Sequence, residues 1–154
     1  MRGALFTVSR SVFDISRQKE VAATPEEEVR QQVVSWLINE KKVPAHLIET
    51  EFALKALDPK NADRLDILVH HFRAGNPLNR PWLLVECKRP GVESPQALQA
   101  QVNKYLRILT PQFIMLALGN RAVFFSLSDD KKSFAPVSDI PEYPVPVRTL
   151  SRGN

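Results

Sequence analysis

The sequence has little of several features that would each point to a particular class of protein. Its 154 residues include one cysteine, so no internal disulfide can form and a reducing, cytoplasmic location is expected. No apolar run approaches the roughly 20 residues that span a bilayer, so we expect no membrane contact. There is also no glycine-rich phosphate loop, which argues against a nucleotide cofactor such as ATP or NAD.

The composition is that of a globular protein. Hydrophobic residues make up 44% and charged residues 25% of the chain, and the length suits one domain with a substantial core. The formal net charge of +4 permits an anionic partner but does not require one.

Hydrophobic periodicity predicts an alternation of helices and strands. Thr24 followed by Pro25 and Glu27 has the pattern of a helix start with a capping box, and a second helix begins at Ser94-Pro95. The expected strands are residues 47–54, 62–72, 82–88, 113–118 and 122–127. The middle strands are apolar on both faces, which predicts an α/β fold with a mixed central sheet flanked by helices.

The ends of the chain differ from its middle. Residues 1–23 read as an N-terminal arm, with a short strand or extended segment at 4–15. Residues 24–128 carry the predicted domain. Residues 129–154 are rich in proline, and we expect an extended, weakly structured tail there.

Two of the apolar runs contain charged residues at positions where a core strand ordinarily has none. Asp66 lies in the run 64–69, and Glu86 and Lys88 lie two apart in the run 82–88. Side chains two apart on a strand share a face, so neighbouring strands would gather two carboxylates and an ammonium group. Buried charges are tolerated mainly when they are paired or bind a metal. The pattern predicts a divalent cation held by Asp66 and Glu86, a site suited to phosphodiester cleavage.

Simpler explanations exist for each of these residues. Asp66 could pair with Arg64 on the same face, and Glu86 could pair with Lys88 on a solvated sheet surface. The neighbouring side chains are apolar on both faces, and this favours the buried site.

Residues on the two predicted helices could contribute to the same site. Glu26 lies on the core-facing stripe of the first helix, although an acid in a first turn is also explained by the helix dipole. Gln101 and Tyr105 lie four apart and share a face of the second helix; a buried glutamine is as readily explained by a bond to the backbone. Cys87 points away from its charged neighbours and is expected to be a core residue without chemistry. His70 and His71 point to opposite faces and are not expected to chelate one ion.

Four segments stand in this order along the chain: Thr24-Pro-Glu-Glu-Glu-Val-Arg-Gln31, Arg64-Leu-Asp-Ile-Leu-Val69, Leu84-Val-Glu-Cys-Lys-Arg-Pro90 and Gln101-Val-Asn-Lys-Tyr105. Within them, Asp66 with Glu86-Cys-Lys88 resembles the PD-(D/E)XK nuclease signature. Together, over about residues 12–127, they resemble the N-terminal nuclease domain of type I restriction enzyme R (HsdR) subunits, particularly its short stand-alone bacterial versions.

The resemblance implies a restriction-endonuclease-like αβββαβ core and Mg²⁺-dependent cleavage of DNA, with Mn²⁺ as a possible substitute. By position, Asp66, Glu86 and the backbone carbonyl of Cys87 would ligate the metal, and Lys88 would act on the attacking water and the phosphorus. Glu26 matches a helix acid that some members add to the metal site. Gln101 and Tyr105 match a Q-x-x-x-Y element that supports the catalytic site and contacts DNA.

Several alternatives stay open. Full-length R subunits continue into an ATP-driven translocase, and this sequence contains no such motor, so translocation-coupled restriction is not expected. The chain could act alone, act with a separate motor or specificity subunit, or be a remnant, and it could form a homodimer. A non-catalytic nucleic-acid-binding or assembly module on the same fold is the main rival, and a nuclease for RNA or for branched or damaged DNA is a third.

Overall fold

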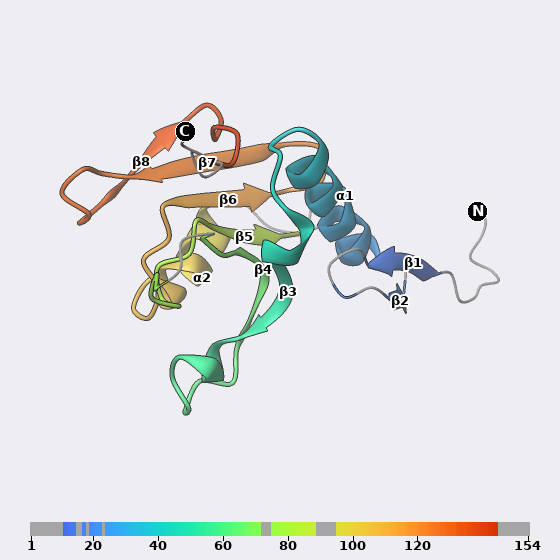
Figure 1. The fold of residues 1–154 in the computed structure, drawn as a ribbon, viewed down its shortest axis with the longest axis horizontal. Coiled ribbons are helices and arrows are strands. Elements are labelled where there is room, and N and C mark those ends of the chain that lie inside the picture. The colour runs from blue at the N-terminus through green and yellow to red at the C-terminus, as the bar shows by residue number, and fades with distance from the viewer. Residues whose placement is uncertain are drawn as a thin grey trace, which may run out of the picture.

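A six-stranded mixed sheet forms the centre of the protein (Figure 1). The computed structural model describes residues 11–14, 17, 19–22, 24–71, 75–88 and 95–144. The sheet order follows the sequence, from β3 to β8; β5 and β6 are parallel and the other neighbours are antiparallel. The strands are β3 (Ile48–Ala53), β4 (Arg64–Val69), β5 (Leu83–Cys87), β6 (Phe113–Ala117), β7 (Ala122–Leu127) and β8 (Phe134–Val137).

The two α-helices pack on different sides of this sheet. Helix α1 (Pro25–Asn39) packs through Val29, Val33 and Leu37 into one hydrophobic core. Helix α2 (Pro95–Tyr105) packs through Val102 and Tyr105 into a second core. The α/β class and the mixed sheet flanked by helices are confirmed, and the arrangement is compatible with a restriction-endonuclease-like fold. No helix among the described residues is long and apolar enough to cross a membrane.

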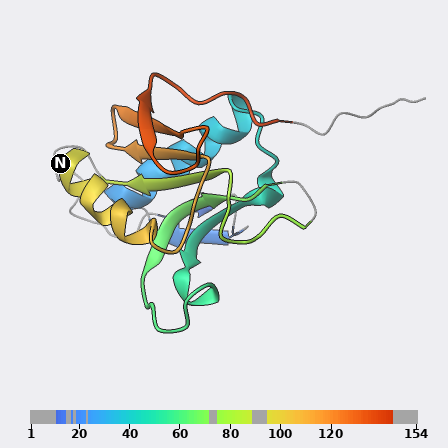
Figure 2. The same ribbon diagram turned by 90° about the vertical axis from the view of Figure 1, so that its left-hand side faces the viewer.

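Shorter elements complete the described chain. Strands β1 (Ser11–Asp14) and β2 (Lys19–Ala22) form an antiparallel pair of their own within the predicted N-terminal arm. Two 3₁₀ turns, η2 (Ala45–Leu47) and η3 (Leu54–Ala56), flank β3. The view of Figure 2 places β3 and β4 toward one end of the molecule and β7 and β8 toward the other.

The first turn of α1 forms largely as its sequence predicts. Thr24 is the N-cap, and its Oγ1 accepts a hydrogen bond from the Glu27 backbone N–H at 3.0 Å. The reciprocal half of the predicted capping box is not seen among the described residues. The Glu27 carboxylate accepts hydrogen bonds from Arg30 and Gln31 instead, so its main role lies in the tertiary structure.

The regular alternation of side chains breaks at one position shared by β3 and β4. Leu65 packs in the core beneath α2 whereas Ile67, two residues later, packs in the core beneath α1. Ile48 and Phe52 on β3 are divided between the two cores in the same way. Residues two or four apart on a regular strand share a face. Both strands therefore change face between these positions, and Asp66 lies at this change.

The proline-rich segment contributes to the fold. Strand β8 pairs antiparallel with β7 from residue 134 to 137, and it tolerates Pro136 because an edge strand leaves one row of backbone donors unused. Ile140 and Tyr143 are buried, and the Tyr143 hydroxyl donates to the His70 carbonyl at 2.8 Å. The expectation of a weakly structured tail is wrong for residues 134–143. The proline content indicated extended backbone and gave no sign of these tertiary contacts. The division of the chain into residues 1–23, 24–128 and 129–154 stays a prediction.

Truncating Ile140 tests whether this segment belongs to the folded core. Ile140 is only 2% exposed, so Ile140→Ala should lower the free energy of unfolding by about 2–5 kcal/mol, through lost burial and the cavity it leaves. Equilibrium denaturation in urea measures the change, with Glu142→Ala at a neighbouring exposed position as the control. Equal stability of the two variants would show that the segment is not part of the cooperative unit.

Candidate functional site

Asp66 on β4 and Glu86 on β5 meet where these two antiparallel strands adjoin. The Asp66 backbone N–H donates to Glu86 Oε1 at 3.3 Å, and the Cys87 backbone N–H donates to Asp66 Oδ2 at 2.8 Å. Each carboxylate therefore accepts a hydrogen bond from the backbone of the other strand. The structure brings together the two acids that the sequence singles out, with the Cys87 backbone beside them.

Burial makes this pair of carboxylates electrostatically unusual. Glu86 is 2% exposed, and burial, followed by the negative charge of Asp66, raises its pKa from an ordinary 4.5 to about 8. Burial also raises the pKa of Asp66, against the opposing effects of the Cys87 N–H and of Arg30. Near neutral pH, a nearby cation would therefore strongly favour the ionised form of Glu86.

Lys88 places an ammonium group at the same end of β5. Its Nζ lies 3.5 Å from Glu26 Oε2, and the two side chains are 23% and 45% exposed. Lys88 also lowers the pKa of both Asp66 and Glu86. The cation is therefore within electrostatic reach of both acids and is oriented by the first turn of α1.

Two of the three acids in the first turn of α1 are exposed or buried in the opposite way to what the sequence indicates. Glu26 was expected to point inward, yet its side chain is half-exposed and turned toward Lys88. Glu27, expected only to cap the helix, is buried at 7% exposure and is bonded to Arg30. The helical stripe pattern fails here because the burial of a first turn depends on where the helix end meets the sheet.

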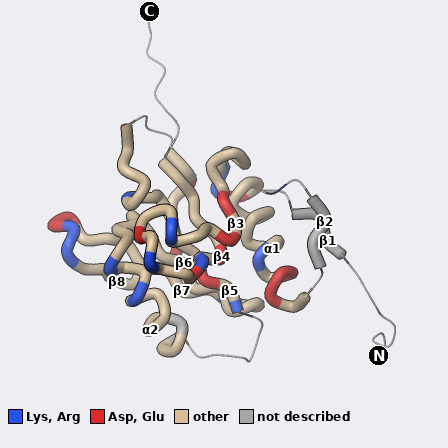
Figure 3. The backbone as a smooth tube through the Cα atoms, turned by 90° about the horizontal axis from the view of Figure 1, so that it is seen from below, with Lys and Arg blue, Asp and Glu red and all other residues tan. Residues whose placement is uncertain are grey.

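Arg30 is the site residue that sequence reasoning missed. Its guanidinium bonds to carboxylates from three elements: Glu27 of α1, Glu51 of β3 at 3.2 Å and Asp66 of β4 at 3.1 Å. Burial acts to lower the pKa of Arg30, but these carboxylates outweigh it and the net shift is upward. An arginine four residues after Glu26 on the same helical stripe was the available signal. Figure 3 shows acidic positions in the first turn of α1 and along the adjoining strands, with basic positions among them.

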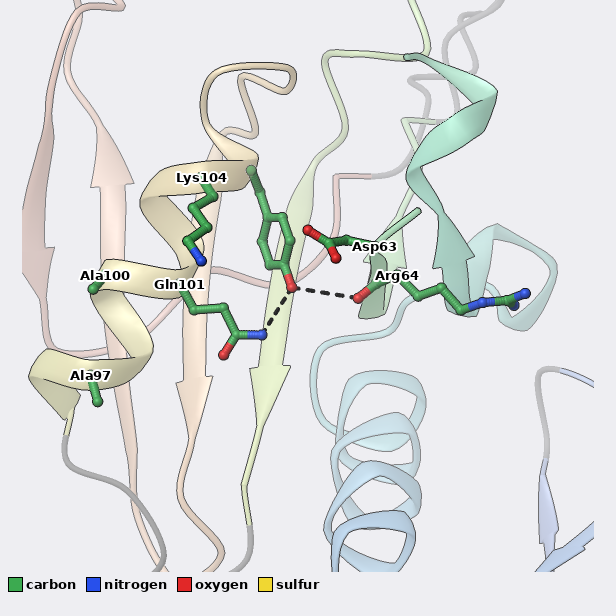
Figure 4. A pocket seen from close by; sticks show the side chains of 7 residues that line it. Asp63, Arg64, Ala97, Ala100, Gln101 and Lys104 are labelled. Carbon is green, nitrogen blue, oxygen red and sulfur yellow. Dashed lines mark hydrogen bonds between the residues drawn. The ribbon is translucent and has the colours of Figure 1, made fainter. Parts of the chain in front are cut away.

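Helix α2 contributes a polar chain of contacts on the other side of the acids. Gln101 Nε2 donates to the Tyr105 hydroxyl at 3.0 Å, and that hydroxyl lies 3.5 Å from the Arg64 carbonyl (Figure 4). Burial and then the charge of Glu86 raise the pKa of Tyr105 to about 12, so the phenol stays protonated. Gln101, Lys104 and Asp63 border a pocket of about 370 Å³, and the Arg64 side chain points away from α2.

The remaining predicted candidates lie apart from this chemistry. Arg64 was considered as a partner of Asp66, but the Asp66 salt bridge is made by Arg30. His70 pairs with Glu49 at 3.0 Å, and His71 borders a separate pocket with Arg80 and Lys131. The Cys87 side chain is buried, and burial raises the pKa of its thiol well above the ordinary value, in keeping with a core role.

The donors present suit a hard divalent cation. Asp66 and Glu86 offer carboxylate oxygens, the ligand type that Mg²⁺ prefers, and the Cys87 backbone lies beside them. The cluster of Glu26, Glu27, Glu51, Asp66 and Glu86 faces Arg17, Arg30 and Lys88, which leaves two negative charges in excess when all are ionised. Among the described residues, no three Asp, Glu, His or Cys side chains form a complete metal cage. A metal here would need backbone, water or phosphate oxygens to complete its coordination.

Comparison with known proteins identifies a family. Residues 25–141 match the family described as type I restriction enzyme R protein N terminus. The matched range contains both helices, the six-stranded sheet and all the acids of the site. No curated protein and no solved structure matches the chain.

The raised pKa of Glu86 predicts a measurable pH dependence of stability. A carboxyl group whose pKa is higher in the folded than in the unfolded state stabilises the fold fully below about pH 4.5, and this contribution is lost as the pH rises to about 8. In the presence of EDTA, the thermal midpoint of the wild type should fall across this range. Glu86→Gln, which keeps the shape without the charge, should flatten this fall and be the more stable protein at about pH 8.

Glu142→Gln is the matched control, because Glu142 is exposed and lies outside the cluster. Parallel pH profiles for Glu86→Gln and the wild type would contradict the assigned electrostatics.

Proposed function

This chain belongs to the family of type I restriction enzyme R protein N termini, and from that premise we propose that it is a metal-dependent endonuclease acting on DNA. The reaction is hydrolysis: water adds to phosphorus, one P–O ester bond breaks, and a phosphomonoester and a hydroxyl end are formed. DNA is the proposed substrate. Other restriction-modification subunits, including a separate motor or specificity subunit, are the proposed partners.

One observation carries this proposal: two carboxylates converge in a buried place beside a lysine. Glu86 is 2% exposed and accepts a hydrogen bond from the Asp66 backbone N–H, and burial followed by the charge of Asp66 raises its pKa, so a cation placed beside both acids would stabilise its ionised form. A structural ion pair would lower this pKa rather than leave it raised. Binding sites for catalytic cations have this character, because the cation supplies the charge that the carboxylates need.

The protein residues divide the work around the substrate phosphate. Asp66 and Glu86 would hold Mg²⁺, with the Cys87 carbonyl as a further ligand. Glu26 contacts Lys88 and would act on the site by orienting that lysine. When bound, the metal supplies Lewis-acid stabilisation of the phosphate and lowers the pKa of a coordinated water. Mn²⁺, which has similar ligand preferences, is expected to substitute.

Lys88 would stabilise the negative charge that develops on the phosphate oxygens and orient the attacking water. Its 3.5 Å contact with Glu26 limits the positions that its flexible side chain adopts. A preoriented cation in a partly desolvated place stabilises a transition state more than a mobile one does.

Helix α2 would line the approach of DNA. Gln101 is held by Tyr105, and its amide oxygen is an acceptor at the edge of the pocket shared with Lys104. These positions suit contact with the sugar-phosphate backbone, which polar and cationic side chains bind without reading sequence.

A non-catalytic nucleic-acid-binding or assembly module is the second candidate. The observation in its favour is that Asp66 already has a cationic partner in Arg30, and that no three-residue metal cage occurs among the described residues. Under this alternative the carboxylates serve only to join α1 to the sheet.

Cleavage of supercoiled plasmid separates the two candidates. Purified chain with Mg²⁺ or Mn²⁺ should nick or linearise the plasmid, and EDTA should abolish this. Asp66→Asn and Lys88→Ala should each lower the rate on the order of 10²–10³-fold, since each removes a group that acts on the developing charge. Binding of a labelled duplex by Lys88→Ala should stay close to that of the wild type.

Lys60→Ala is the control for loss of one positive charge, because Lys60 is exposed and its side chain takes no part in the cluster. Cleavage that survives in Lys88→Ala would refute the role given to Lys88. Duplex binding with no cleavage under either cation would favour the non-catalytic module.

A further inference from the structure

The Arg30 guanidinium fixes the direction of one Asp66 oxygen. Arg30 Nη2 donates to Asp66 Oδ1 at 3.1 Å while the Cys87 N–H donates to Oδ2 at 2.8 Å. Two donors from different elements, one on each oxygen, define the plane of the carboxylate. Each oxygen keeps a second lone pair, so both remain able to face a cation.

Arg30 is itself held from two further sides. Its Nη1 donates to Glu27 and to Glu51 Oε2, and its side chain is 9% exposed. The Nε hydrogen has no partner among the described residues, although an unmet buried donor costs about 1–3 kcal/mol. The three carboxylates that bond Nη1 and Nη2 therefore set the orientation of the planar guanidinium fork, even though the Nε hydrogen stays without a hydrogen bond.

Glu51 occupies a strained conformation to reach this place. Its φ is 54°, in the left-handed region that costs a non-glycine residue about 1–2 kcal/mol. It lies between the ladder pairs Thr50–Ile67 and Phe52–Leu65, directly across from Asp66. This is where both strands change face. Glycine would relieve the strain, but only a side chain with a carboxylate at this position can bond Arg30.

From these contacts we propose that Arg30, held by Glu27 and by the strained Glu51, is a positioning residue that orients Asp66 for metal binding. This inference rests on the proposed function, since it assumes that Asp66 is a metal ligand. Groups that orient ligating carboxylates typically change metal affinity by about 10–100-fold when they are altered. The fork matters as well as the charge, because one planar guanidinium reaches three carboxylates in fixed directions and a lysine ammonium would not.

Simple electrostatics makes the opposite prediction for the same residue. A positive charge 3.1 Å from a metal ligand repels a divalent cation, so removing it should tighten metal binding if Arg30 is only a charge or a structural tie. The positioning role predicts that binding weakens. The sign of the change therefore distinguishes the two.

Direct titration with Mn²⁺ measures this sign without any need for catalysis. Free Mn²⁺ is followed by electron paramagnetic resonance as the ion is added to the purified chain. Arg30→Lys, which keeps the charge and loses the fork, should bind Mn²⁺ about 10-fold or more weakly than the wild type. Arg30→Met should also bind more weakly, although it removes a positive charge.

Arg30→Met removes a buried cationic partner of Glu27, which keeps only the 3.4 Å contact with Arg17 and the bond from Gln31, and could fail to fold. The double variant Arg30→Met with Glu27→Gln removes the poorly compensated charge of Glu27 and is made alongside it. Unfolding midpoints without metal identify the folded variants. Glu51→Gln should weaken Mn²⁺ binding in the wild type, and by less in the Arg30→Lys background, where the fork is already lost. Glu49→Gln, at an exposed acid of the same strand, is the control.

The outcomes separate this inference from the proposed function. Mn²⁺ binding that is lost in Asp66→Asn and weakened in Arg30→Lys supports both. Binding that needs Asp66 but is unchanged or tighter in the Arg30 variants overturns the positioning role and leaves the metal site intact. Absence of binding by the wild type, or binding that survives in Asp66→Asn, overturns both.

Discussion

The burial of the Asp66 and Glu86 carboxylates is the constraint around which the site is built. Both are largely withdrawn from water, which raises the pKa of each, and the negative charge of Asp66 raises the pKa of Glu86 further. The surrounding groups reduce this cost from several directions. Arg30 bonds Asp66, the backbone N–H groups of Asp66 and Cys87 bond the two carboxylates, and Lys88 lies within electrostatic reach. At Glu86 these groups do not offset burial and the charge of Asp66, so its pKa stays near 8, and either a proton or a bound cation would neutralise the carboxylate.

The fold brings these groups together by distorting a sheet that is otherwise regular. Strand β5 is buried along its whole length, so the residues that flank Glu86 on this strand are packed in the protein interior. The neighbouring strand β4, and β3 beyond it, change face at Asp66 and Glu51, and these two side chains turn toward Arg30 of α1. Groups held in this way on strands and a helix are better fixed than groups on loops, which is what electrostatic catalysis requires. Stability and preorganisation thus depend on the same contacts.

The sequence was sufficient for the parts of this arrangement that depend on local pattern. Asp66, Glu86 and Lys88 stand out because charge interrupts an apolar strand, and strands β3 to β7 with helices α1 and α2 follow from periodicity and capping, whereas β8 does not. The role of Arg30 could not be read in this way, since an arginine on a helix is ordinarily solvated and its three partners come from three elements. The same limit applies to Glu26 and Glu27, whose exposure depends on how α1 meets the sheet. It applies also to Ile140 and Tyr143, whose burial is purely tertiary.

Charge balance also bears on the choice between a nuclease and a binding module. With Glu86 protonated and the other acids of the cluster ionised, one negative charge is in excess, and it repels a phosphate backbone unless a cation lies between them. A bound divalent cation removes that repulsion and adds stability to the fold, about 2.7 kcal/mol at a hundred times its dissociation constant. The same ion would then satisfy Glu86, admit the phosphate and activate water. In a module that only binds DNA, these acids would join α1 to the sheet and leave the repulsion in place, whereas a cation bound by Asp66 and Glu86 would remove it.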